Sequence, residues 1–264
     1  MQVCTSKSVS SVVDTLLRRG CSAHEQNKEG ETPMHLECRN MRVASMAVVK
    51  SLLHAGAPAD PPVHSGGFAA PSPLSLVLKG GQEAAANSFS NISNKLSDSF
   101  DGGTDRTRSG DRRIWVPLAE LLVKSGALWS THMSKLNQEM HLHLLLRAYP
   151  PPQDQAIQYS FLVHSALKSG LDPLVENNKG RNSIFIFCEV CGRTAGSMLP
   201  ESQEILSELL WYCPSDGVGI MGTDRSGMSV FDIKESVPGS ALSRCRKLLQ
   251  SWFDGTVNES DVQP

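Results

Sequence analysis

The chain repeats one pattern of apolar residues: a small or apolar pair, a two-residue gap, a second apolar pair and then a glycine. The clearest copies are VVDTLLRRG at residues 12–20 and VVKSLLHAG at residues 48–56. Further copies lie at residues 118–126 and 162–170, a fifth at 205–213 ends in Cys213-Pro214 instead of glycine, and a degenerate sixth spans 245–252. Because apolar pairs four residues apart share a helical face, each copy predicts a short amphipathic helix. The glycine stands where a left-handed C-terminal cap belongs.

A second pattern alternates with the first. TPMHL at residues 32–36 is echoed by SPLSL at 72–76, MHLHL at 140–144, NSIFI at 182–186 and SVFDI at 229–233. Thr, Ser and Asn cap helix N-termini, and Pro is tolerated in the first turn. Turn signals precede three of these segments, and they end at Gly30, Gly180 and Gly227. Each unit therefore predicts a turn, a first helix, a loop, a second helix and a glycine stop.

GETPMHLE, residues 30–37, resembles the T-P-L-H-x-A signature of ankyrin repeats, which pair two helices with a β-turn. The resemblance is strongest in residues 11–58 and extends over most of the chain. It implies an all-α fold, an ankyrin-repeat solenoid of stacked helix-turn-helix units. We expect one solenoid over residues 1–264, with a lone second helix at 9–19 and a tail at 255–264. The five expected repeats span about residues 27–60, 67–130, 135–174, 177–216 and 224–254.

Length varies mainly between the two helices of a unit, whereas the junctions between units vary little. Gly20 to Thr32 and Gly170 to Asn182 are both 12 residues apart. A stack of repeats requires constant junctions and tolerates insertions in outer loops. The longest insertion, residues 80–113, is rich in Ser, Gly and Asn, and we expect it to be a disordered loop. Its basic cluster leaves a regulatory or docking role open beside that of a tolerated insertion.

Composition and charge limit the classes of partner and the cellular location that we expect. The chain has 264 residues, 40% hydrophobic residues, 6% aromatic residues and a net charge of −2. This balance favours neither nucleic acid nor anionic lipid as a partner. The N-terminus lacks the apolar segment of a signal peptide, and no apolar run approaches the roughly 20 residues of a membrane span. We therefore expect no membrane insertion and an intracellular location, cytoplasmic or nuclear.

Candidate chemistry is sparse. His35 has no nucleophile or acid in a recognisable constellation, and the ankyrin resemblance implies a structural role for it at a repeat junction. Cys188 and Cys191 form the one CxxC motif, without the second ligand pair that a zinc site needs. His141 and His143 are two residues apart and diverge on a helix. We expect no catalytic residue, no cofactor, no metal and no small-molecule substrate.

The sequence thus predicts a non-enzymatic module, a scaffold or adaptor that binds another protein. The resemblance implies binding through the repeat tips and the adjoining first-helix face. The candidate partner-binding residues are Lys28, Glu29, Glu31, Arg39, Asn40, Asn178, Lys179, Arg181, Asp224 and Arg225. An alternative is the regulatory or targeting region of a larger enzyme such as a kinase or transferase. A third reading is a hydrolase that uses Cys188 or Cys191 with a distant histidine.

Overall fold

A computed structural model describes residues 6–41, 45–61, 71–95, 114–130, 139–194, 201–214, 219–220, 222–236 and 240–254. The chain divides into two compact units. The first contains residues 1–84 and 92–128, and the second contains residues 85–91 and 129–264. Each unit is described by itself. The described elements are helices, so the expected all-α fold of paired helices is confirmed for this part of the chain.

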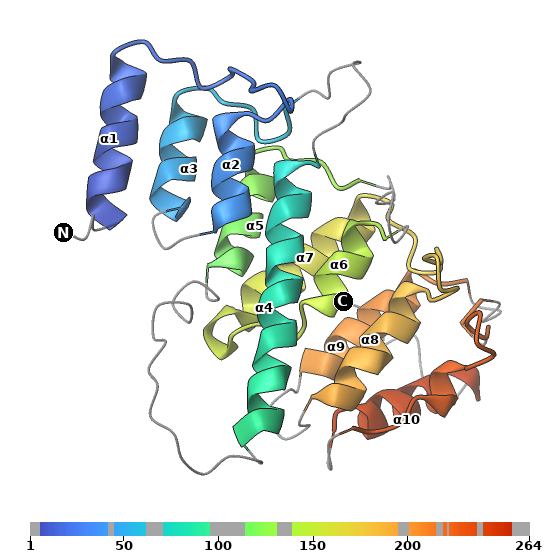
Figure 1. Ribbon diagram of the computed structural model, residues 1–264. Coiled ribbons are helices and arrows are strands. Elements are labelled where there is room, and N and C mark those ends of the chain that lie inside the picture. Colours follow the sequence, from blue (N-terminus) through green and yellow to red (C-terminus); the bar gives the residue numbers. More distant parts are fainter. Residues whose placement is uncertain are drawn as a thin grey trace. The chain divides into compact units, whose positions relative to one another are not determined.

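Five helices are described in the first unit, and one of them, α4, also includes residues 85–91 of the second unit (Figure 1). They are α1 (Ser6–Arg18), α2 (Pro33–Asn40), α3 (Ser45–His54), α4 (Pro73–Lys95) and α5 (Trp115–Lys124). Helix α3 packs on α2 along one side and on α1 along another. The apolar pairs of α3 and α5 are mostly buried, as their spacing predicted. Burial of these stripes accounts for most of the stability of such short helices, since isolated helices of this length are marginal in water.

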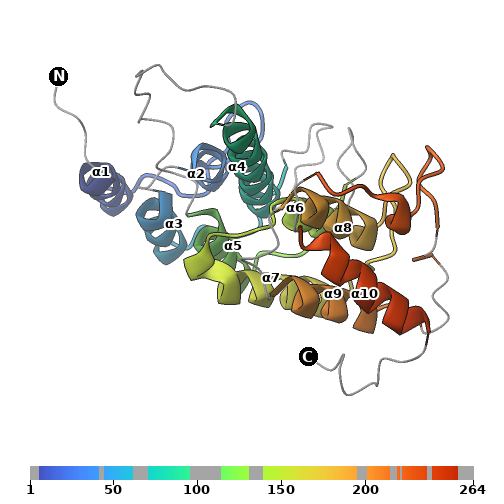
Figure 2. The same ribbon diagram turned by 90° about the horizontal axis from the view of Figure 1, so that it is seen from below.

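The second unit repeats the pairing (Figure 2). Its elements are α6 (His141–Arg147), the 3₁₀ turn η2 (Gln153–Gln155), α7 (Ala156–Lys168), α8 (Ser183–Arg193), α9 (Glu201–Trp211), the 3₁₀ turn η4 (Val230–Asp232) and α10 (Leu242–Phe253). The first helices α6 and α8 lie side by side in one row, and the second helices α7 and α9 lie in another. Between the rows, the ring of Tyr149 lies 5.7 Å from that of Tyr159 and 5.1 Å from that of Phe187.

Helix starts and stops fall where the sequence placed them. Helices α2, α4, α6 and α8 and the turn η4 begin directly after the five residues expected to start them, namely Thr32, Ser72, Met140, Asn182 and Ser229. The stop glycines Gly20, Gly56, Gly126 and Gly170 have φ of +91°, +86°, +94° and +89°. This left-handed conformation is strained for residues with a Cβ atom, which explains why glycine recurs there.

One expectation about the insertion is wrong. Residues 80–95 belong to α4 and are helical, whereas we expected a disordered loop to begin at residue 80. Gly80 and Gly81, at the start of the expected loop, permit close packing within the helix: a Cβ atom on Gly81 would lie 2.7 Å from the ring of Trp115. The following Gln82, Glu83 and alanines favour helix. Residues 96–113 and the predicted tail lie outside the described residues.

No helix among the described residues is long and apolar enough to cross a bilayer.

Candidate partner-binding surface

Each predicted tip with an upstream turn signal is built on one polar side chain. In the first unit the Asn27 side-chain oxygen accepts the amide N–H groups of Glu29 and Glu31, at 3.0 and 2.8 Å. The Gly30 amide donates to the Asn27 carbonyl, and Gly30 has φ of +78°. The side chain thus accepts hydrogen bonds from backbone N–H groups that would otherwise need water as their acceptor. The tip is therefore fixed by local hydrogen bonds.

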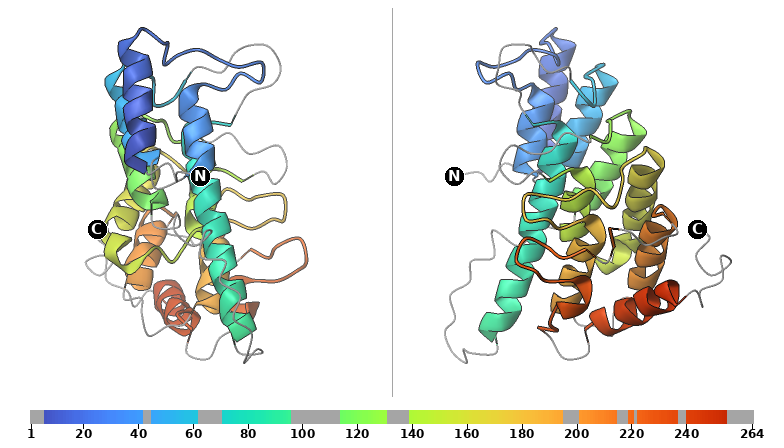
Figure 3. Two further views of the ribbon diagram at one scale, coloured as in Figure 1. Left: turned by 60° about the vertical axis from the view of Figure 1, so that its left-hand side comes forward. Right: turned by 90° about the vertical axis from the view of Figure 1, so that its right-hand side faces the viewer.

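The two tips of the second unit have the same geometry. Asn177 and Asp224 each accept the amides two and four positions ahead, at 2.9 Å from Lys179, 3.1 Å from Arg181, 2.8 Å from Ser226 and 3.1 Å from Met228. The two tips also touch, because the Arg225 amide donates to the Lys179 carbonyl at 3.0 Å. Both loops project to the same side in Figure 3. Lys179 and Arg225 are exposed there.

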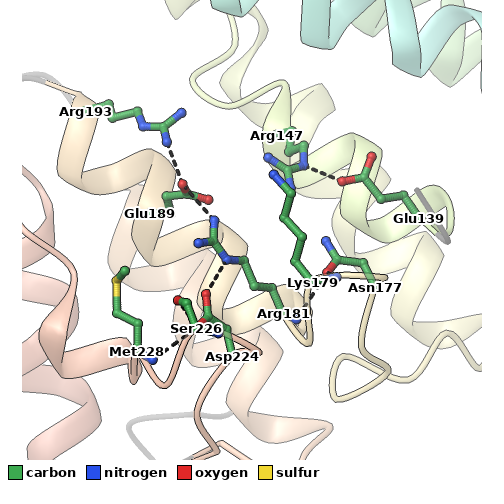
Figure 4. A network of polar contacts seen from close by, with 10 residues as sticks. All are labelled: Glu139, Arg147, Asn177, Lys179, Arg181, Glu189, Arg193, Asp224, Ser226 and Met228. Carbon is green, nitrogen blue, oxygen red and sulfur yellow. Dashed lines mark hydrogen bonds and ion pairs between the residues drawn. The ribbon is translucent and has the colours of Figure 1, made fainter. Parts of the chain in front are cut away.

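Ion pairs between residues eight positions apart lie at the first helices of three repeats. Glu31 pairs with Arg39, and the Glu139 carboxylate lies 2.7 Å from Arg147 Nε. In the next repeat the signs are exchanged, and Arg181 Nη1 lies 3.1 Å from a Glu189 oxygen (Figure 4). Each pair joins the residue two positions before a first helix to a residue in the second half of that helix. In the two of these repeats whose tips are described, the pair therefore holds the tip against its helix.

The exchange of signs allows Arg181 to join two repeats. Its Nε lies 2.9 Å from an Asp224 oxygen (Figure 4). Its guanidinium lies 4.9 Å from the centre of the Phe185 ring. The Asp224 side chain is 2% exposed, so its charge requires compensation. The hydroxyl of Ser226 lowers the pKa of Asp224 below its usual range, and the amide of Met228 and the guanidinium act in the same direction. Asp224 is therefore ionised and tied to its neighbours.

The ten predicted residues fall into two groups by their surroundings. Glu31 and Asp224 are buried and Arg181 is partly buried, and all three are held in ion pairs. Arg39 is half exposed and paired with Glu31. Asn178 is partly buried and also has an interaction partner. The five that present exposed side chains without an ion pair in the described part of the chain are Lys28, Glu29, Asn40, Lys179 and Arg225.

Of the residues that build the tips, Asn27 and Asn177 were missed by the sequence analysis, and Asp224 was expected to contact a partner instead. Asn27 and Asn177 stand three positions before Gly30 and Gly180, as Asp224 does before Gly227. The Glu139–Arg147 pair and Glu189 follow the eight-residue spacing of Glu31 and Arg39. Both signals are visible in the sequence once the repeats are aligned on their glycines.

The three buried histidines, His35, His141 and His143, have structural roles. His35 Nδ1 accepts the Thr32 amide at 3.0 Å, and His143 Nε2 lies 3.0 Å from the carbonyl oxygen of Val175, at the junction with the next repeat. Burial lowers the pKa of His35 and lowers the pKa of His143 to about 4. His141 accepts the Ser130 amide at 3.0 Å, and burial lowers its pKa to about 4 as well. At pH 7 these rings are neutral and are held in place by hydrogen bonds to the backbone.

The CxxC motif is part of the core. Cys188 and Cys191 of α8 are buried against Cys245 of α10. Hydrogen bonding with Cys245 and burial raise the pKa of both α8 thiols, which keeps them as neutral, poorly nucleophilic thiols. Within the described ranges, no three His, Cys, Asp or Glu side chains are arranged to hold a metal ion.

Turn, capped first helix, second helix and left-handed glycine recur in register along the chain. Within the described residues of each unit, the helices pack in pairs, the arrangement that the sequence resemblance to ankyrin repeats implies. Among solved structures, the human ASB11 ankyrin repeat domain is similar over 94% of this chain and 95% of that chain, with a TM-score of 0.40 and 15% sequence identity. No protein-family model matches the chain. No curated protein matches it either.

Proposed function

We propose that the chain is a non-enzymatic protein-binding module, a scaffold or adaptor whose tips contact the partner. The observation that supports this most directly is the pair of tips in the second unit, which are hydrogen-bonded to each other and carry the exposed cations Lys179 and Arg225. Repeat stacks present extended surfaces of this kind. A partner segment with carboxylate groups would suit these two cations.

Preorganisation is the physical advantage of this surface. The tip backbones are fixed by the side chains of Asn177 and Asp224 and by the ion pairs of Arg181. Binding therefore orders few groups beyond the two long side chains, which limits the entropic cost of association. Interfaces obtain most of their affinity from a few such residues, and charged residues at the rim mainly raise the association rate.

The test compares the proteins that co-purify with the wild-type chain and with a double variant, Lys179→Glu with Arg225→Glu, by quantitative mass spectrometry. The matched control is Lys168→Glu with Lys247→Glu, which makes the same change in net charge at exposed positions on second helices. We expect a specific partner to be lost from the tip variant and kept by the control. A tip variant that is folded by circular dichroism and keeps every partner would refute the proposal.

The first unit offers a parallel test at its own tip, where Lys28 and Glu29 are exposed. A Lys28→Glu, Glu29→Lys variant reverses both charges and leaves the net charge unchanged. Loss of the partner in this variant would extend the contact surface to the first unit. Retention of the partner there, with loss in the second-unit variant, would confine the surface to Lys179 and Arg225.

A further inference from the structure

Helix α1 exposes residues whose equivalents are buried in α3, α5, α7 and α9. Val12 is 56% exposed and Leu16 is 48% exposed, and Val9, one turn earlier, is 39% exposed. These three side chains lie three and four positions apart and form one stripe. Helix α1 is an amphipathic helix whose apolar face is only partly covered, although it packs on α3.

The equivalent positions follow from the repeated apolar pattern. In α3 they are Val48 and Leu52, which are 4% and 2% exposed. In α5, α7 and α9 they are all between 0% and 1% exposed: Leu118 and Leu122, Leu162 and Ala166, and Ile205 and Leu209. An apolar face that is open in α1 and closed in these four helices indicates a missing neighbour.

The structure indicates what kind of neighbour fits. In α3 the stripe belongs to VVKSLL, residues 48–53, and α2 packs on this helix. In α1 the stripe belongs to VVDTLL, residues 12–17, and Figures 1 and 2 show no described helix of the first unit beside it except α3. Val12 and Leu16 of α1 match Val48 and Leu52 of α3, so a helix like α2, which packs on α3, would suit the corresponding face of α1. The buried side chains of α2 include Met34 and Cys38.

We propose that the α1 stripe, Val9, Val12 and Leu16, docks a short amphipathic helix of a partner protein. The helix resembles α2, lies antiparallel to α1 and completes a helix pair. A second copy of α1 fits less well, because α1 has no acidic residue in its first turn, the turn that would lie beside Arg18 in an antiparallel pair. In contrast, the first turn of an incoming helix suits acidic residues, which would lie beside Arg18 and Arg19.

This surface is separate from the tips, so it goes beyond the proposed function. The probe is a fluorescein-labelled peptide of residues 31–41, made helical by a lactam bridge between positions 36 and 40 (Leu36→Glu, Asn40→Lys). Both positions are exposed in α2, so the bridge leaves Met34 and Cys38 available. Fluorescence anisotropy measures binding to the full chain under reducing conditions. We expect saturable binding that is lost when the peptide contains Met34→Asp.

Variants of the protein locate the contact. Val12→Asp and Leu16→Asp are each expected to weaken peptide binding about tenfold, since each side chain would bury about half of its apolar surface on docking. Both side chains are substantially exposed, so the variants should fold. The control Ile157→Asp removes an apolar side chain that is 86% exposed on α7 and should bind normally. The Lys179→Glu, Arg225→Glu tip variant should also bind normally, which separates this inference from the proposed function.

Three outcomes would overturn the inference. Binding that is equal for wild type, Val12→Asp and Leu16→Asp would place the peptide elsewhere. Sedimentation showing a wild-type dimer that Leu16→Asp converts to monomer would identify the occupant as a second copy instead of a partner helix. Peptide that does not bind at any soluble concentration would equally refute it.

Discussion

Acidification should destabilise the second unit through His141 and His143. Burial lowers the pKa of each imidazole to about 4, against about 6.5 in an unfolded chain. A folded-state pKa below the unfolded one means that the unfolded chain binds more protons between these values. The stability contributed by each neutral ring is therefore complete above about pH 6.5 and is lost as the pH falls toward about 4.

The magnitude follows from linkage. At about pH 5.5 an imidazole with these two pKa values reduces the free energy of unfolding by about 1.4 kcal/mol relative to neutral pH, and two together reduce it by about 3 kcal/mol. This is a substantial fraction of the roughly 5–15 kcal/mol by which native proteins are stable. Choosing about pH 5.5 keeps ordinary carboxyl groups ionised, so the histidines dominate the change.

The assay is urea unfolding followed by circular dichroism and by tryptophan fluorescence, at about pH 7.5 and about pH 5.5. His143→Gln should cost stability at the higher pH because the ring lies 3.0 Å from the Val175 carbonyl. It should also remove about half of the pH-dependent loss, and adding His141→Gln should remove most of the rest. His54→Gln, at an exposed position on α3, is the control and should behave as wild type. The reasoning fails if the double variant loses as much free energy on acidification as wild type does.

Two substitution series probe the tips by the same unfolding assay. Asp224→Asn keeps an oxygen for the two amides, as Asn177 does, and should cost about 1–2 kcal/mol through the lost pairing with Arg181, whereas Asp224→Ala should cost about 2–4 kcal/mol. Equal losses of stability in Asp224→Asn and Asp224→Ala would show that the hydrogen bonds from the turn amides to residue 224 contribute nothing. Gly227→Ala adds a Cβ atom in open space and should cost only the backbone strain of about 1 kcal/mol, whereas the Cβ atom of Gly180→Ala would lie 3.1 Å from the Arg225 amide nitrogen and should cost more. A smaller cost at residue 180 would contradict this packing.

The starts and stops of the helices could be predicted from sequence because they depend on local chemistry. A left-handed glycine at residue 56 and an extended cap at Asn182 each satisfy backbone groups within a few residues, and the required residue types are few. The length of α4 could not be predicted in this way. Its glycine pair ordinarily signals a break, and only the ring of Trp115, distant in sequence, shows why glycine is needed within a helix.

It was harder to predict from the sequence which tip residues are exposed, because the charge of a side chain does not show whether it is held in an ion pair. Glu31 and Glu29 are two residues apart and chemically identical, yet Glu31 is 7% exposed and paired, and Glu29 is exposed. The difference is the ion pair that Glu31 makes with Arg39, eight residues later in the sequence. A single sequence displays this spacing, but its meaning depends on knowing that residue 31 precedes a helix and residue 39 lies in its last turn.

This distinction decides how binding experiments on the tips should be interpreted. Replacing Asp224 or Arg181 would remove hydrogen bonds that shape two neighbouring turns, so a lost partner would follow from a deformed surface as readily as from a missing contact. Replacing Lys179 or Arg225 changes only exposed side chains, while their backbone hydrogen bond can persist. A loss of affinity in these two variants, with an unchanged free energy of unfolding, therefore reports on the interface itself.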